Sequence, residues 1–291
     1  MQKKDVIIYQ GTQAMPGILR LPDSEVPAPG IVFANGYCAY MEMYDEMAEA
    51  FCKAGYATLQ YEPRGARGSE FGLFLCGTGW LEDCCAAISF LWGQPEVDHN
   101  RIGLAGVSMG GATTVRQGAF DPRVKALLAM APVDSWADIM EYFWTANRGA
   151  DAYAGWKQEM YEDAARVARG FPSRTVSGGY GCRGVDNDPA AEAEELAAHP
   201  YKVQALPIAS IFNSFMYVDS PLAATKIHKP LCIIHGTADP VCPHTCGQKI
   251  YDAAPAEHKM IHFVEGAGHV LPEEVPDVCI QVGLSWFDQY L

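Results

Sequence analysis

Long hydrophobic runs are missing from this 291-residue sequence. No stretch approaches the roughly 18 apolar residues that a membrane-spanning helix needs. The apolar run near the first residue covers only positions 6–9, which is shorter than the core of a secretory signal peptide. We therefore expect neither a membrane span nor a secretory signal.

Basic residues are also scarce, with 21 Lys and Arg against 35 Asp and Glu, and the formal net charge is −14. Nucleic acids and anionic membrane surfaces attract clusters of basic residues, so the charge balance argues against both as partners. No N-x-S/T glycosylation acceptor occurs. The ten cysteines lie mostly in apolar segments, where free cysteine behaves as a small hydrophobic residue. We expect a cytoplasmic protein.

What the sequence does contain is a large apolar fraction, 49%, arranged as short strands that alternate with helices. This alternation over residues 1–133 and 230–291 predicts an α/β core with a mostly parallel sheet covered on both faces. Residues 134–229 interrupt the alternation, and they far exceed a connection of about 2–6 residues. Because they have helical character, we predict a helical cap inserted into the core.

Residues 101–114 read RIGLAGVSMGGATT, in which a short apolar strand runs into Gly-Val-Ser-Met-Gly and small residues follow. A serine nucleophile needs an exposed position, and glycines on either side leave room for a strained strand-to-helix turn. We predict that Ser108 is such a nucleophile. The alternative is a surface serine in a glycine-rich loop.

A serine nucleophile also needs a base and an acid that orients the base. His269, in a Gly-Ala-Gly-His turn after a strand, is the predicted base, whereas His235 and His262 lie at the end of a strand or inside one and are expected to be structural. Asp239, in the loop sequence GTADP, is the predicted acid, although a solvated loop aspartate is the simpler interpretation. Asp134, in MAPVDSW, is the rival acid.

Two backbone N–H groups must stabilise the oxyanion that forms when a serine attacks a carbonyl. Met109 directly follows the predicted nucleophile, and Tyr37 lies in the loop ANGYCAY after an apolar strand. We predict that these two amides form the oxyanion hole. The alternative for the Tyr37 segment is a simple turn.

With these motifs in place, the chain resembles the α/β-hydrolase superfamily, in particular the branch with dienelactone-hydrolase-like and serine-aminopeptidase-like enzymes. The resemblance rests on the turn Gly106–Gly110, on Asp239 in HGTADP and on His269 in GAGH. It implies the α/β-hydrolase fold and no need for a metal or an organic cofactor.

The sequence departs from that branch at two positions. The segment YEPRGARGSE is similar to the loop Asp-x-Arg-Gly-x-Gly-x-Ser of the branch, with Glu62 in place of the aspartate. Many relatives have His-Gly at the start of the oxyanion loop, where this chain has Asn35-Gly36. The second departure puts help from a histidine side chain in doubt, but leaves the backbone donors.

We therefore expect a serine hydrolase that cleaves an ester, thioester or lactone of a medium-sized, mainly apolar small molecule through an acyl-enzyme. Acyl transfer, carbon–carbon bond hydrolysis, an aminopeptidase reaction and a non-catalytic ligand-binding role stay open as alternatives. Selectivity is expected from aromatic residues of the cap, some in the core of the cap and some facing the substrate: Trp144, Trp156, Phe212, Phe215 and Tyr217.

Two other motifs favour simpler interpretations. The glycine-rich sequence GYGCRG, residues 179–184, matches a nucleotide-binding pattern but has no strand directly before it and no helix directly after it, so we expect a flexible cap loop. The sequence CPHTC, residues 242–246, offers too few ligands for a metal site. We expect neither a nucleotide nor a metal at these positions.

Overall fold

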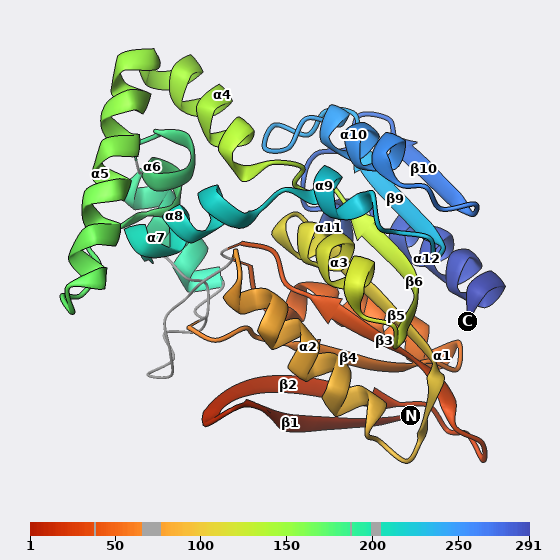
Figure 1. Cartoon of the computed structure of the whole chain (residues 1–291). Coiled ribbons are helices and arrows are strands. Elements are labelled where there is room, and N and C mark those ends of the chain that lie inside the picture. Colours follow the sequence, from red (N-terminus) through yellow and green to blue (C-terminus); the bar gives the residue numbers. More distant parts are fainter. Residues whose placement is uncertain (38, 66–76, 187, 199–204) are drawn as a thin grey trace. The chain divides into compact units, whose positions relative to one another are not determined.

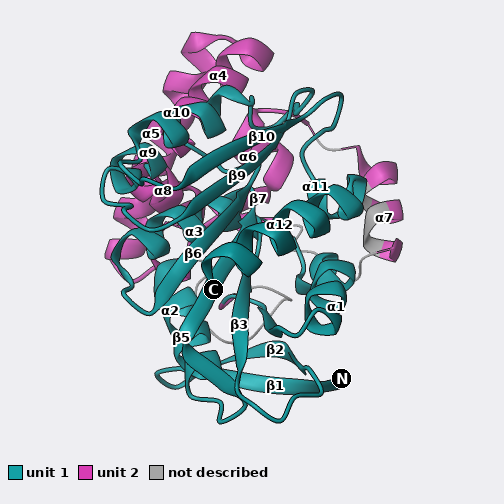
Figure 2. Cartoon of the chain, turned by 90° about the vertical axis from the view of Figure 1, so that its right-hand side faces the viewer, with its two compact units in different colours: residues 1–63, 81–134, 219–291 teal, residues 64–80, 135–218 magenta. Residues whose placement is uncertain are grey.

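The chain separates into two compact units. The structure is a computed structural model that describes residues 1–37, 39–65, 77–186, 188–198 and 205–291. The first unit comprises Met1–Pro63, Leu81–Asp134 and Asp219–Leu291, and the second comprises Arg64–Trp80 and Ser135–Val218 (Figure 2).

The first unit is built on an eight-stranded sheet with the strand order β1-β2-β4-β3-β5-β6-β9-β10 (Figure 1). Strand β2 is antiparallel to β1 and β4, and all other neighbouring strands are parallel. The mostly parallel sheet is therefore confirmed. The strands are β1 (Gln2–Gln10), β2 (Gln13–Leu21), β3 (Ala28–Ala34), β4 (Ala57–Tyr61), β5 (Val97–Val107), β6 (Val124–Met130), β9 (Leu231–Gly236) and β10 (Lys259–Val264).

Helices cover both faces of this sheet, and each face has its own buried cluster. Val32 of β3 belongs to the cluster with α2 and α3, whereas Ile31 and Phe33 belong to the cluster with α1 and α12, because successive side chains of a strand point to opposite faces. The helices of this region are η1 (Met41–Tyr44), α1 (Asp45–Lys53), α2 (Gly79–Trp92), α3 (Met109–Phe120), α9 (Ser220–Ala224), α10 (Thr245–Ala253), α11 (Leu271–Glu274) and α12 (Pro276–Tyr290).

The second unit consists of helices and a two-stranded antiparallel sheet. The rings of Trp144 and Trp156 stack in its interior, with centroids 5.3 Å apart, and Tyr180 contacts both rings edge-on. The elements are α4 (Trp136–Arg148), α5 (Ala150–Ala168), β7 (Thr175–Ser177), α6 (Gly178–Arg183), α7 (Pro189–Ala198), β8 (Ala205–Pro207) and α8 (Ile208–Tyr217).

The boundaries of the second unit differ from the predicted insertion at residues 134–229. Asp219–Leu291 belongs to the first unit, because α9 packs against α3 and α10 and Ser220 Oγ donates to the carbonyl of Val133 at 2.6 Å. Arg64–Trp80 belongs to the second unit, where Asn213 Oδ1 accepts from the Thr78 backbone N–H at 2.8 Å. Both differences arise from contacts between distant parts of the sequence.

The glycine-rich segment 179–184 is a short helix, α6, and not the predicted loop. Ser177 caps this helix by accepting from the Tyr180 N–H. Gly181 packs closely against Ile211, because a Cβ atom at Gly181 would lie 2.4 Å from Cδ1 of that side chain. Gly184 ends the helix in the left-handed conformation, with φ 65°.

Within the described residues, none of the helices is both long enough and apolar enough to cross a bilayer.

Candidate active site

Ser108 lies between β5 and α3 in a backbone conformation that is rare for a residue with a side chain. Its φ is 58° and its ψ −120°. A Cβ atom at Gly106 would lie 2.5 Å from the carbonyl oxygen of Gly110, and one at Gly110 would lie 2.0 Å from that of Ala34. The two glycines are thus needed for close backbone approach, and the turn is strained in the way that functional turns often are.

Ser108, His269 and Asp239 form one hydrogen-bonded chain. His269 Nε2 lies 2.9 Å from Ser108 Oγ, and His269 Nδ1 lies 2.7 Å from Asp239 Oδ2. A carboxylate can only accept, so Nδ1 carries the hydrogen, and Nε2 of the neutral ring is left to accept from the serine hydroxyl. This arrangement can withdraw a proton from Ser108.

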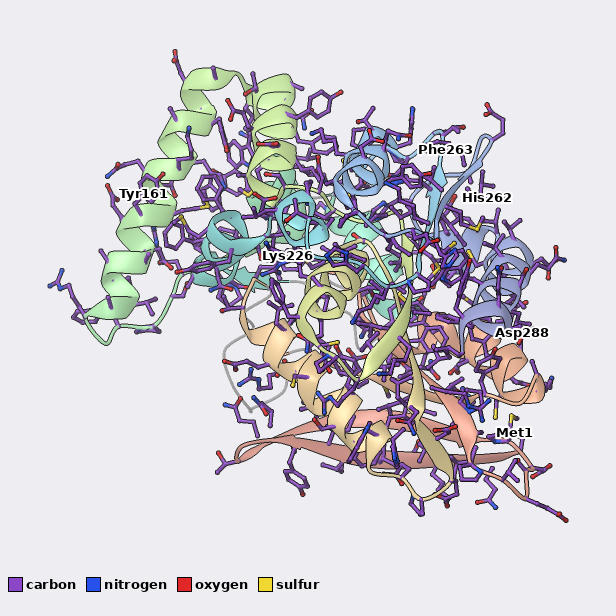
Figure 3. The ribbon with its side chains drawn as sticks, turned by 45° about the vertical axis from the view of Figure 1, so that its right-hand side comes forward. Met1, Tyr161, Lys226, His262, Phe263 and Asp288 are labelled. Carbon is purple, nitrogen blue, oxygen red and sulfur yellow. The ribbon has the colours of Figure 1, made fainter. Side chains whose placement is uncertain are left out.

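The sheet topology explains why these residues meet. Ser108 follows β5, Asp239 follows β9 and His269 follows β10, and the carboxyl ends of these parallel strands lie at one edge of the sheet. By contrast, His262 lies inside β10 next to Phe263, as expected of a structural residue (Figure 3).

The Asp239 carboxylate is fully buried and accepts several hydrogen bonds. Its Oδ1 accepts from the backbone N–H groups of Val241 and Cys242, both at 2.8 Å. Burial alone would raise the pKa of Asp239, but hydrogen bonds from His235 and His269 outweigh burial and hold this pKa well below its usual range. The group is therefore an ionised acceptor for the imidazole.

His235, which the sequence suggests is structural, is a second imidazole beside this carboxylate. Its Nε2 lies 3.4 Å from Asp239 Oδ2 and 2.9 Å from the carbonyl oxygen of Cys242. Because a carbonyl oxygen can only accept, Nε2 of His235 carries the hydrogen and donates. A histidine four residues before the acid is the only sequence signal for this contact.

Glu274 is a contact of the site that sequence reasoning missed. Its Oε2 accepts from the Gly268 N–H at 2.7 Å and its Oε1 from the Val270 N–H at 2.9 Å. The carboxylate thus holds the backbone on both sides of His269. Glu274 is the last residue of α11, and this place gives no hint of the contact in the sequence.

The predicted oxyanion donors lie on two segments beside Ser108. Met109 is the first residue of α3, so its N–H is one of those at the helix start that have no partner within the helix. Tyr37 follows Gly36, where an added Cβ atom would lie 3.6 Å from Cβ of Ser108. The loop after β3 therefore runs beside the serine, and the roles of the two amides stay predictions.

Asp134, the rival acid, is paired differently. Its carboxylate is almost fully buried, and Oδ2 accepts from Lys249 Nζ at 2.7 Å. Its backbone carbonyl accepts from the Ser220 N–H at 2.7 Å. The structure thus joins Asp239, and not Asp134, to His269.

The five aromatic residues predicted in the insertion have different environments in the second unit. Trp144 and Trp156 are buried in its core, at 2% and 1% exposure. Phe212 and Phe215 of α8 are half-buried, and Tyr217 at the end of that helix is 54% exposed. Only the last three therefore offer surface to a ligand.

The CPHTC segment holds no metal-type cluster in the described part of the chain. Burial raises the pKa of the Cys242 thiol well above its usual value, and it raises that of Cys246 as well. Both groups are therefore protonated thiols at neutral pH.

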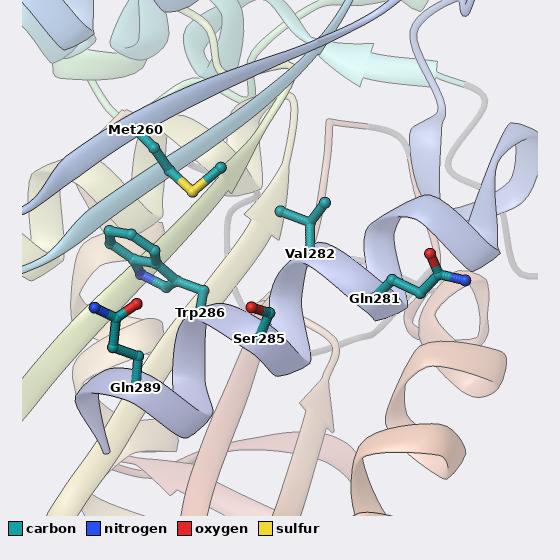
Figure 4. Close-up of a pocket in the computed structure, with 6 residues that line it drawn as sticks. All are labelled: Met260, Gln281, Val282, Ser285, Trp286 and Gln289. Carbon is teal, nitrogen blue, oxygen red and sulfur yellow. The ribbon is translucent and has the colours of Figure 1, made fainter.

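A groove of about 270 Å³ lies on the first unit between β10 and α12 (Figure 4). Apolar Val282 and Trp286 share it with the amide side chains of Gln281 and Gln289. It contains none of the predicted site residues.

The fold, together with the serine turn at the edge of its sheet, defines an α/β hydrolase. A family model described as serine aminopeptidase, S33, matches residues 26–276. The chain therefore belongs to this family of hydrolases.

The chain is also similar to individual proteins. The chain is 26% identical over 288 residues, 94% of each chain, to an uncharacterized 31.7 kDa protein from the traX-finO intergenic region of Escherichia coli. It is 36% identical over 118 residues to the thiohydrolase aneE of Aspergillus aculeatus. The aligned residues cover 39% of this chain and 37% of aneE. The solved structure of DcsB in complex with its substrate analogue is similar in fold, with a TM-score of 0.81, 19% identity and 99% of both chains covered.

Proposed function

We propose that this protein is a serine hydrolase that cleaves an ester, thioester or lactone of a medium-sized, mainly apolar small molecule through an acyl-enzyme. The observation that carries the proposal is the hydrogen-bonded chain from Asp239 through His269 to Ser108. Neither nucleic acid nor a membrane is a partner in this proposal.

In the proposed first step, Ser108 Oγ attacks the substrate carbonyl while its proton passes to His269 Nε2. The N–H groups of Met109 and Tyr37 donate to the oxyanion of the tetrahedral intermediate. The intermediate collapses when His269 returns the proton to the leaving group, which departs and leaves the acyl group on Ser108. Asp239 keeps the imidazole oriented and stabilises its charged form.

In the second step, water attacks the acyl-enzyme and gives one proton to His269. Collapse of the second intermediate releases the acid and returns that proton to Ser108. An alcohol, amine or thiol in place of this water would give acyl transfer instead. The same side chains serve both reactions, so the acceptor decides between them.

The proposed substrate class draws on two observations. The thiohydrolase aneE matches part of this chain, which favours a thioester among the possible bonds. The second unit offers aromatic surface at Phe212, Phe215 and Tyr217. Because the serine chemistry is generic, we propose that this insertion, acting as a cap, provides the selectivity for apolar acyl groups.

Turnover measurements test the proposal. We expect the protein to hydrolyse aryl esters and acyl thioesters, with no need for added metal, and Ser108→Ala to abolish both activities. Product analysis with and without a competing alcohol or amine separates hydrolysis from acyl transfer. Turnover by Ser108→Ala equal to that of the wild type, or activity confined to peptide amides, would contradict the proposal.

Two variants of the second unit test the selectivity. We expect Phe215→Ala to lower kcat/KM for a bulky aryl ester more than for an acetyl ester, because a larger acyl group has more apolar surface to bury against an aromatic side chain. Trp144→Ala is the matched control, since that side chain is in the core. Equal losses on both esters in Phe215→Ala would place the specificity elsewhere.

A further inference from the structure

The buried side chain of Glu62 forms hydrogen bonds with two residues of the loop that carries Tyr37. Glu62 directly follows β4 and is 1% exposed. Its Oε2 accepts from Asn35 Nδ2 at 2.9 Å, and its Oε1 accepts from the Met41 backbone N–H at 2.7 Å. These two donors come before and after Tyr37 in the chain.

A carboxylate at such a depth is costly unless donors compensate the lost hydration. Among the donors to Glu62 are the Asn35 amide and the Met41 backbone N–H, at 2.9 Å and 2.7 Å. The Glu62 side chain therefore ties the end of β3 to the start of η1 with two hydrogen bonds.

Gly36, next to Tyr37, lies beside the turn that carries Ser108. A Cβ atom at Gly36 would lie 3.4 Å from the carbonyl oxygen of Val107 and 3.6 Å from Cβ of Ser108. Tyr44 Oη also links the two strand ends, because it donates to the Ala34 carbonyl at 2.8 Å and accepts from the Val107 N–H at 2.9 Å. A change in the position of Asn35 would thus move the Tyr37 N–H relative to Ser108.

We propose that Glu62 is a positioning residue for the oxyanion hole. By holding Asn35 and Met41, its carboxylate fixes the direction of the Tyr37 N–H toward the oxygen that becomes negative. The proposal rests on the proposed function, since it concerns the same reaction. Asn35 and Glu62 are also the two positions at which the sequence departs from the branch that it resembles, and here they contact each other.

Two substitutions at Glu62 separate this role from a general loss of stability. Glu62→Met keeps the length of the side chain and removes both acceptors. Glu62→Gln keeps an acceptor for Met41 and gains a donor for Asn35, whose Oδ1 has no hydrogen-bond partner among the described residues and can turn toward it. Tyr56→Phe is the matched control, because it removes one bond, to Asp288 at 2.6 Å, away from the loop.

We expect Glu62→Met to lower kcat by about 10- to 100-fold with little change in KM, since a displaced donor weakens only the transition state. Glu62→Gln restores most of this loss. The inhibition constant of an alkyl trifluoromethyl ketone, which forms a tetrahedral adduct on a serine, should rise in parallel with the loss in kcat/KM. Thermal melting measures the loss of stability in each Glu62 variant and in Tyr56→Phe, so that losses of kcat can be compared at similar stability.

Equal kcat in Glu62→Met and the wild type would overturn the proposal, as would a loss of kcat without weaker ketone binding. If Glu62→Met does not fold, Asn35→Ala replaces it, with an expected loss of about tenfold in kcat, and no loss would count against the role. Ser108→Ala is measured alongside. If it retains turnover, the proposed function fails, whereas an inactive Ser108→Ala with a fully active Glu62→Met sinks only this inference.

Discussion

Two buried carboxylates follow neighbouring strands of the sheet. Asp134 lies beyond β6 and Asp239 beyond β9, and these strands pair in parallel. The side chains are 2% and 0% exposed, and the closest cationic or imidazole nitrogen lies 2.7 Å away from each. The two sites differ in what that nitrogen belongs to, a lysine ammonium for Asp134 and an imidazole for Asp239.

This difference shows that the role of each aspartate depends on its partner residue, and not on its burial or its position in the sheet. Lys249 compensates the charge of Asp134, and its ammonium group has only donors, so it cannot accept a proton from a serine hydroxyl. His269 has a second ring nitrogen, 2.9 Å from Ser108 Oγ, so the charge of Asp239 can influence a proton transfer. An acid at a strand end is thus a candidate for catalysis only when a titratable group connects it to the reacting atom.

Amide substitutions should separate the two acids most clearly. We expect Asp239→Asn to lower kcat/KM by about 10⁴-fold, because the amide no longer holds the imidazole in the required tautomer. Asp134→Asn should change kcat/KM far less. Steady-state kinetics on one ester measures both, with melting curves to confirm that each variant is folded. The opposite ranking would make Asp134 the acid.

The lysine partner of Asp134 should affect stability and not turnover. Removing one member of a buried pair leaves an uncompensated charge, but Lys249 is 54% exposed, so solvent reduces the cost. We expect Lys249→Met to lower the free energy of unfolding by about 1–2 kcal/mol, as measured by urea denaturation.

The double variant Lys249→Met with Asp134→Asn is the control for this prediction. It should regain part of the lost stability, since no buried charge then lacks its partner. A large loss of kcat in folded Lys249→Met would connect Asp134 to the chemistry after all.

The acid dependence of stability should show the smallest effect. The pKa of Asp239 is lower in the folded chain than in the unfolded one, so its carboxylate stabilises the fold above about pH 4, and this contribution is lost as the pH falls further. Asp163 of the second unit behaves alike, because hydrogen bonds from Ser173 and Arg174 outweigh burial and lower its pKa.

Asp239→Asn and Asp163→Asn should therefore both flatten the fall of the urea midpoint below about pH 4. Only Asp239→Asn should also lower turnover at neutral pH. An unchanged slope in Asp239→Asn would contradict the lowered pKa.

Much of the first unit could be predicted from the sequence because local patterns determine it. The glycines around Ser108, the short apolar strands and the turn before His269 each carry their own signal. Asp239 follows the strand that comes before the strand of His269 in the sequence, and the two strands pair in parallel, so their ends meet at one edge of the sheet.

The contacts that could not be predicted from the sequence are side-chain contacts between residues that tertiary packing brings together. Three such contacts depend on the burial and direction of side chains, which leave no periodic pattern in a sequence. They are His235 with Asp239, Glu274 with the backbone on both sides of His269, and Glu62 with Asn35. The segment Arg64–Trp80 likewise joins the second unit through Asn213, far away in the chain.

The central claim is that Ser108 is the nucleophile at the end of the chain from Asp239 through His269. Treatment with a fluorophosphonate, followed by peptide mass analysis, tests it most directly. The account predicts one covalent adduct, located on Ser108, and much slower labelling of Asp239→Asn, with Asp134→Asn labelled nearly as fast as the wild type. An adduct on another residue, or no adduct on a folded and active protein, would contradict it.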